Sequence, residues 1–165
     1  ANWALPVRWN KQHEAFFAEH GRRQRVFCAS LADVFDNEVD QQWRNDLFRL
    51  ISETPNLDWL LLTKRPENIL AGVAASGIPC PRNIRLGTSV ETQKYLWRVK
   101  EMVNAALQLN LPTFVSVEPQ LEALRLPLHG VDHVIQGAES GKGRRPFDIE
   151  WMRPMLADCR KSTHL

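Results

Sequence analysis

The sequence predicts an α/β fold in which parallel strands alternate with helices. Short apolar runs of strand length recur along the 165 residues, and most precede a segment with apolar residues at helical spacing. One run, DWLLLT at 58–63, is apolar almost throughout, as expected of a strand buried on both faces of a parallel sheet. Strands that alternate with helices in this way form parallel βαβ units with right-handed crossovers.

Each element follows from its local pattern. The expected strands are residues 25–30, 58–63, 84–90, 113–118 and 132–137. The expected helices are residues 9–21, 39–54, 66–77, 91–109 and about 149–160. The helix at 39–54 is assigned an apolar face that includes Trp43. The segment LRLPLHG at 124–130 stands where a regular helix would otherwise follow the fourth strand.

Two architectures accommodate this order. The first is a partial (β/α) barrel of about five to six parallel strands, and the alternative is an open doubly wound sheet. A complete eightfold barrel typically takes about 250 residues. We therefore expect residues 1–165 to form a single domain that is an internal portion of a longer barrel protein.

Composition excludes several classes of protein. The 44% apolar and 24% charged residues are ordinary for a globular domain, and no apolar run approaches the roughly 20 residues of a membrane span. The net charge of +2 is too small to imply nucleic acid by itself. Cys28, Cys80 and Cys159 form neither a CxxC pair nor a disulfide framework. This favours a reducing cytoplasm, no membrane, and no metal site within this chain.

The expected strands all deliver polar groups at their C-terminal ends, where both architectures place the ligand site. These residues are Ser30, Asp33, Thr63, Lys64, Arg65, Ser89, Glu91, Ser116, Glu118, Gly137, Glu139 and Ser140. Asp33, Ser89 and Glu91 could instead cap the helices that follow them. Taken together, the set predicts a site for a polar ligand with both carboxylate and cationic partners, although it names no reaction.

The loop GAESGKGRRP at 137–146 joins the last strand to the last helix. Its spacing matches neither the GxGxxG dinucleotide pattern nor the GKS/T of a phosphate-binding loop. We expect it to form one wall of the site, with Glu139 turned into the site or toward a neighbouring amide. Arg144 and Arg145 are expected to face solvent or the next helix.

Several motifs occur together in one order over nearly the whole chain: PVRWN, RVFCASLADVFDN, NLDWLLLTKRPENI, IRLGTSVETQ, FVSVEP and GAESGKGRRP. In this combination the chain resembles the phage Gp37/Gp68 family of radical-SAM-like, three-Cys-motif proteins. The resemblance implies a partial barrel of the radical SAM type that binds S-adenosylmethionine across its rim. It also implies a [4Fe-4S] cluster held by three closely spaced cysteines, which this chain lacks, so the cluster is not expected here and the chain alone is expected to be inactive.

The rim residues that match motif positions of that family are Lys64, Arg65, Ser89, Glu91, Ser116, Glu118 and Glu139. The resemblance makes them candidates for cofactor or substrate contacts and names no substrate, which could be a small molecule or a macromolecule. A second hypothesis is a non-catalytic module, associated with a phage or mobile element, that keeps the rim for a ligand. A third is nucleic-acid binding through Arg22, Arg23, Arg25 and the basic segment 142–145, by contacts to phosphates.

Overall fold

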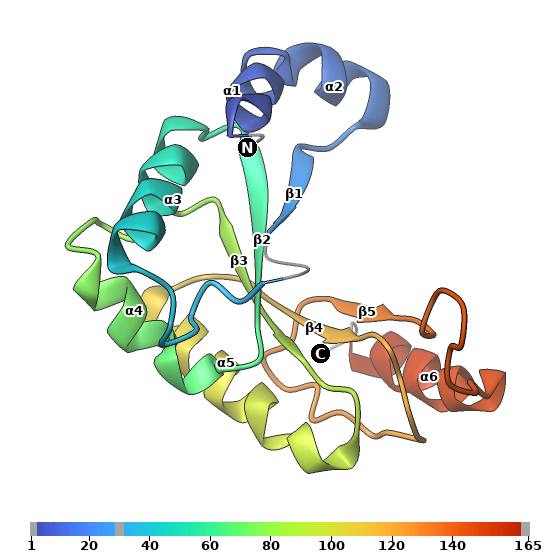
Figure 1. Ribbon diagram of the computed structural model, residues 1–165. Coiled ribbons are helices and arrows are strands. Elements are labelled where there is room, and N and C mark those ends of the chain that lie inside the picture. Colours follow the sequence, from blue (N-terminus) through green and yellow to red (C-terminus); the bar gives the residue numbers. More distant parts are fainter. Residues whose placement is uncertain (1–2, 29–31, 163–165) are drawn as a thin grey trace.

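The computed structural model describes residues 3–28 and 32–162 and shows an α/β fold built on one parallel sheet. The strands are β1 (Gln24–Cys28), β2 (Leu57–Thr63), β3 (Ile84–Ser89), β4 (Thr113–Val117) and β5 (Val134–Gln136). They pair in chain order, β1-β2-β3-β4-β5, and the sheet curls into half a barrel (Figure 1). A doubly wound sheet reverses its strand order at a switch point. The partial barrel is therefore confirmed, and the open doubly wound alternative is wrong.

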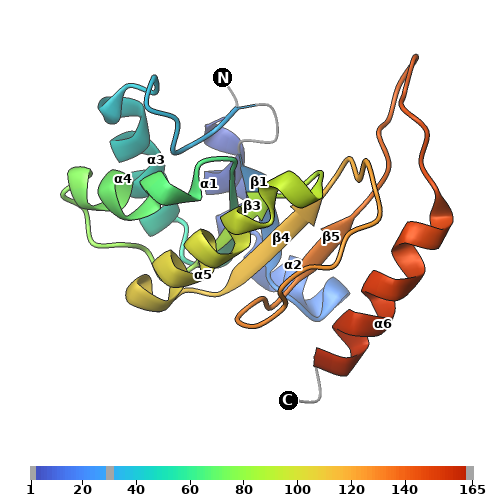
Figure 2. The same cartoon turned by 90° about the horizontal axis from the view of Figure 1, so that it is seen from below.

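Helices cover one face of this sheet. The helices are α1 (Ala4–Lys11), α2 (His13–His20), α3 (Gln41–Glu53), α4 (Ile69–Ala75), α5 (Trp97–Leu109) and α6 (Met152–Ser162). Short 3-10 turns occupy η1 (Pro66–Asn68), η2 (Gln93–Tyr95) and η3 (Ile149–Trp151). Figures 1 and 2 show α3, α4 and α5 on the same side of the strands, as right-handed crossovers between successive neighbours require.

The main core lies between the sheet and these helices. Leu57, Trp59 and Leu61 of β2 are buried there against Phe48 and Ile51 of α3. The intervening residues of the strands face the concave side, because side chains alternate between the two faces of a sheet.

Aromatic and aliphatic side chains line the concave side. Leu60 of β2 and Phe114 of β4 are buried outside the main core, and the ring of Phe27 lies 6.0 Å from that of Phe114. Phe27 keeps 44% of its surface exposed, which shows that the inside of the half barrel is open. The inner wall is therefore accessible to a ligand.

Two helix boundaries differ from the expectation. The helix expected at 9–21 is divided into α1 and α2 around Gln12, whose backbone leaves the helical region, and Gly21 ends the second with φ 64°. The helix expected from Glu91 begins at Trp97, because Thr92 is extended and η2 follows it. Glu91 therefore caps no helix. Segment 124–130 contains no helix, as predicted.

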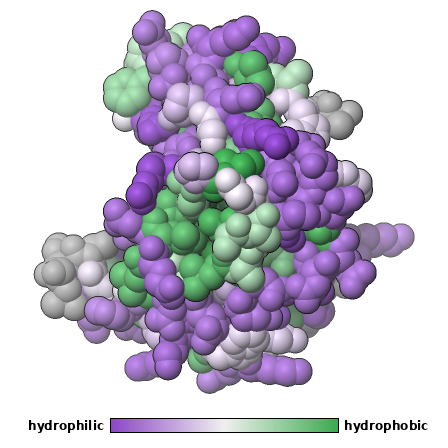
Figure 3. All heavy atoms as spheres, turned by 90° about the vertical axis from the view of Figure 1, so that its left-hand side faces the viewer, coloured by the Kyte–Doolittle hydropathy of each residue, from purple (hydrophilic) through white to green (hydrophobic). Residues whose placement is uncertain are grey.

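One face of the molecule is hydrophilic around an apolar centre. Figure 3 shows the side that carries α3 and α4, where an apolar area in the middle is surrounded by hydrophilic residues. Within residues 3–28 and 32–162, no helix is both long enough and apolar enough to cross a membrane.

Candidate functional site

The polar residues at the strand ends meet along one edge of the half barrel. The register pairs Thr63 with Thr88 and Ser89 with Ser116, so the ends of β2, β3 and β4 are adjacent. Ser30 lies outside the described residues. The remaining rim residues divide into a structural group around Asp33, an ion-pair group around Glu91, and a group that faces the concave cavity.

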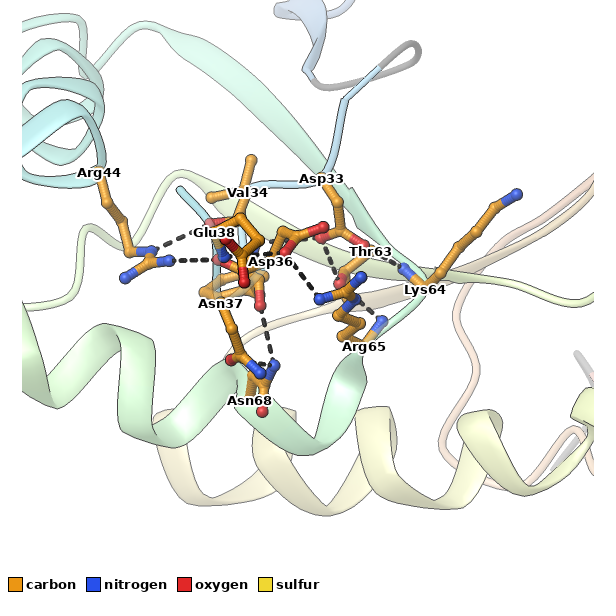
Figure 4. A network of polar contacts seen from close by, with 11 residues as sticks. Asp33, Val34, Asp36, Asn37, Glu38, Arg44, Thr63, Lys64, Arg65 and Asn68 are labelled. Carbon is orange, nitrogen blue, oxygen red and sulfur yellow. Dashed lines mark hydrogen bonds and ion pairs between the residues drawn. The ribbon is translucent and has the colours of Figure 1, made fainter. Parts of the chain in front are cut away.

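Asp33 holds the end of β2 to the loop after β1. Its Oδ1 accepts hydrogen bonds from Thr63 Oγ1 at 2.6 Å and from the Phe35 amide at 3.0 Å, while Oδ2 accepts from the Lys64 amide at 2.8 Å (Figure 4). Thr63 is buried, and its hydroxyl also accepts a hydrogen bond from the Arg65 amide. Both side chains are thus occupied in fixing the rim, and neither is available to a ligand without breaking these bonds.

Arg65 belongs to the same structural network. Its Nη1 donates to Asp36 Oδ1 at 2.6 Å, and Figure 4 shows its side chain pointing away from that of Lys64. Buried Arg44 of α3 donates to the carbonyls of Val34 at 2.9 Å and Asp36 at 3.1 Å. Arg65 lines neither rim cavity described below, so the geometry gives it a role in holding loop 33–38.

Glu91 forms the second group with two cations. Its Oε1 lies 2.9 Å from Lys64 Nζ, and its Oε2 lies 3.4 Å from Arg98 Nη1. Arg98 also donates to the Ser89 carbonyl at 3.1 Å, and its guanidinium lies 4.0 Å from the centre of the Tyr95 ring. Arg98 was not among the residues selected from the sequence, because it lies on α5 and reaches back to the strand end.

Ser116 and Glu118 face the concave cavity. They line a hollow of about 480 Å³ together with Phe27, Leu62, Pro119, Ala138, Glu139, Ser140 and Arg145. Ser89 is the strand neighbour of Ser116, and both are buried at the top of the inner wall. Among the described residues, no hydrogen bond reaches either serine hydroxyl, and none reaches the exposed Glu118 carboxylate. Ser116 and Glu118, which line the hollow, therefore keep hydrogen-bonding capacity for a ligand, whereas Ser89 lines neither rim cavity.

Gly137 fixes how closely the Glu118 side chain approaches β5. A Cβ at position 137 would lie 2.9 Å from Glu118 Oε1 and 3.3 Å from its Cγ. The Gly137 amide donates to the Val117 carbonyl, and its own carbonyl accepts from Gln120. Gly137 therefore has a steric role beside the carboxylate.

Glu139 lines the cavity, and its carboxylate is bound there to Arg145. Its two carboxylate oxygens accept from Arg145 Nε at 2.9 Å and Nη2 at 2.7 Å, and Oε2 also accepts from the Arg145 amide at 2.8 Å. These hydrogen bonds lower the pKa of the Glu139 carboxyl to about 2. Arg145 is exposed, as expected, and its guanidinium also closes loop 137–146 on Glu139. Ser140 is exposed at the edge of the cavity.

One protein-family model matches nearly the whole chain. Residues 1–164 match the model of the family described as Protein of unknown function (DUF5131). The chain belongs to the DUF5131 family. No curated protein and no solved structure matches it.

The cysteines of this DUF5131 chain lie in three separate places. Cys28 ends β1, Cys80 follows α4, and Cys159 lies in α6. Burial raises the pKa of the Cys80 and Cys159 thiols, which disfavours the thiolates that bind metals. Over residues 3–28 and 32–162, no cluster of His, Cys, Asp and Glu could hold a metal ion. These residues do not fit a [4Fe-4S] cluster.

The basic residues at the start of β1 in this DUF5131 chain already have partners within the protein. Arg23 forms an ion pair with Asp58 at 3.2 Å and donates to the Leu57 carbonyl. The Arg22 guanidinium lies 5.5 Å from the centre of the Phe16 ring. Arg25 lies on β1, and together with Arg85 and burial it lowers the pKa of His133. The three arginines therefore contact different groups, and this arrangement does not favour a continuous phosphate-binding surface.

Proposed function

We propose that this chain supplies the ligand-binding rim of a radical-SAM-like barrel and that S-adenosylmethionine is the ligand. The observation that carries the proposal is the Glu118 carboxylate, unpaired among the described residues, beside Ser116 in a cavity of about 480 Å³ at the open mouth of the half barrel. The motif series from 6–10 to 137–146 supports the choice of ligand through its resemblance to the phage Gp37/Gp68 family.

The chemistry of the cavity suits the parts of this molecule. A carboxylate such as Glu118 attracts the sulfonium and ammonium groups, and the hydroxyl of Ser116 can exchange hydrogen bonds with ribose hydroxyls. The exposed ring of Phe27 and the side chain of Leu62 offer an apolar surface for the adenine. Arg145, also in the cavity wall, can attract the carboxylate of the ligand.

The proposal includes no redox step for this chain. Because Cys28, Cys80 and Cys159 do not fit a [4Fe-4S] cluster, the residues present can bind and orient a ligand but supply no electron for cleaving it. The substrate of a complete protein stays open. A rim that binds the ligand without catalysis is the second candidate, and it is favoured by the same separation of the cysteines.

Calorimetric titration with S-adenosylmethionine tests the proposal. We expect saturable binding that the Glu118→Gln variant weakens by about five- to thirtyfold, as for the loss of a charge-assisted contact. Glu53→Gln is the matched control, since Glu53 is exposed in the last turn of α3 and lines neither rim cavity. S-adenosylhomocysteine, which lacks the sulfonium charge, should bind more weakly than S-adenosylmethionine. Absence of binding, or equal binding by wild type and Glu118→Gln, would overturn the proposal.

A further inference from the structure

Three cations face a second hollow beside the rim cavity. Lys64, Arg98 and Arg145 line a cavity of about 290 Å³ together with Glu91, Thr92, Tyr95, Pro119 and Leu121. Arg145 and Pro119 also border the larger cavity that contains Glu118. The two hollows are thus neighbours, one with an unpaired carboxylate and the other dominated by positive charge.

Hydrogen-bond donors outnumber acceptors in this second hollow. Glu91 forms ion pairs with both Lys64 and Arg98, at 2.9 Å and 3.4 Å, and so divides one carboxylate between two cations. The Glu139 carboxylate is occupied by Arg145. The Nε of Arg98 is buried and has no hydrogen-bond partner in the part of the chain that the structure describes. An unmet buried donor is costly, so Arg98 has fewer acceptors than it can use while it shares Glu91 with Lys64.

The side chains of the two cations that flank Glu91 differ in how freely they can move. The Arg98 side chain is only 11% exposed and is held by the Ser89 carbonyl and the Tyr95 ring. The Lys64 side chain is 62% exposed, so its ammonium can turn toward a bound group without moving the backbone. A fixed guanidinium beside an adjustable ammonium is a suitable arrangement for an oxyanion, since the first presents a rigid set of donors and the second a point charge.

We propose that this hollow binds the oxyanion of a ligand, a phosphate or a carboxylate, with Lys64 and Arg98 as its principal donors. Glu91 aligns both cations when the site is empty and shares them with the anion when it is filled. The shared wall at Arg145 and Pro119 would let one molecule place a neutral or cationic part beside Glu118 and an anionic part here. The inference does not depend on the identity of the ligand in the larger cavity.

The test is a titration of the isotopically labelled chain with inorganic phosphate and, separately, acetate at constant ionic strength, followed by amide NMR shifts. We expect saturable shifts confined to residues around 64, 91–98, 119–121 and 145. Saturation by phosphate alone would identify a phosphoryl site, and saturation by both would identify a general oxyanion site that also takes carboxylates. Absence of saturable shifts with either anion, or shifts centred elsewhere, would overturn the proposal.

Matched variants separate a specific site from general surface charge. Lys64→Ala should weaken anion binding by about three- to fivefold, the scale of one partly exposed ionic contact. Lys100→Ala removes the same charge from the exposed face of α5 and should leave binding unchanged. Arg98→Lys keeps the charge but loses the guanidinium, and it should weaken binding with a well-dispersed spectrum that reports correct folding. Equal weakening by Lys64→Ala and Lys100→Ala would overturn the proposal, whatever the outcome with S-adenosylmethionine.

Discussion

The ring of Phe114 lies directly over Gly87, its strand partner, on the concave face of the half barrel. A Cβ on Gly87 would sit 2.1 Å from Cζ and 2.2 Å from Cε1 of that ring. Phe114 is fully buried and in contact range of Phe27. The absence of a side chain at position 87 therefore lets an aromatic ring cover the inner wall just below Ser89 and Ser116.

We expect Gly87→Ala to lower the free energy of unfolding by about 1–3 kcal/mol or more, as for overpacking in a well-filled interior. The added methyl group must displace the buried Phe114 ring, which has no flexible end to move aside. Urea denaturation measures the change. In a Phe114→Leu background the same substitution should cost clearly less, because the ring is gone. An equal cost in both backgrounds would rule out the clash with Phe114 as its cause.

Arg44→Leu should also destabilise the protein, by about 1–3 kcal/mol for carbonyls left without donors. The substitution removes the hydrogen bonds to Val34 and Asp36 and so releases loop 33–38, which Figure 4 shows next to the end of β2. Arg49→Leu is the control on the same helix, since Arg49 is exposed and forms its ion pair with Asp46 of that helix. Thermal unfolding of both variants measures the loss of stability. An equal loss of stability in Arg44→Leu and Arg49→Leu would contradict the role given to Arg44.

The strands could be predicted from the sequence because each is a short apolar run, as in DWLLLT. The face that each helix turns toward the core was harder to predict. The pattern placed Trp43 in the core, yet 67% of its surface is exposed and its neighbour Arg44 is buried instead. Arg44 can take that place only because loop carbonyls accept its hydrogen bonds. The spacing of apolar residues along a helix contains no information about such partners, because the carbonyls belong to a separate loop.

The position of the rim could be predicted, but not the pairing of its side chains. Parallel strands bring their C-terminal ends to one edge, and Ser89 of β3 lies beside Ser116 of β4 there. Which cation meets which carboxylate depends on loop geometry that no local pattern encodes. Glu139 was expected to turn into the site or toward a neighbouring amide. The amide of Arg145, six residues further along, does bind it, but the bonds from the Arg145 guanidinium were not foreseen.

Gly137→Ala should disturb ligand binding more than stability. The new methyl group would meet the Glu118 side chain, a flexible group that can swing away at little cost in folding. We expect a small change in the unfolding temperature and, if the rim binds S-adenosylmethionine as proposed, a loss of affinity of about three- to tenfold from the misplaced charge. In a Glu118→Gln background Gly137→Ala should have much less effect on affinity. A full additional loss in that background would show that Gly137 acts on the ligand by another route.

The Glu139–Arg145 pair should determine the pH below which loop 137–146 loses stability. Hydrogen bonds from Arg145 lower the pKa of the Glu139 carboxyl from 4.5 to about 2. Since the folded pKa is depressed, the pair stabilises the loop fully above pH 4.5, and this contribution is lost as the pH falls toward 2. An NMR titration of the Glu139 carboxyl measures the pKa directly. Arg145→Met should return it close to 4.5, whereas Arg144→Met, which removes an exposed charge next to it in the chain, should leave it low. A wild-type pKa near 4.5, or an equal rise in both variants, would contradict the assignment of this pair.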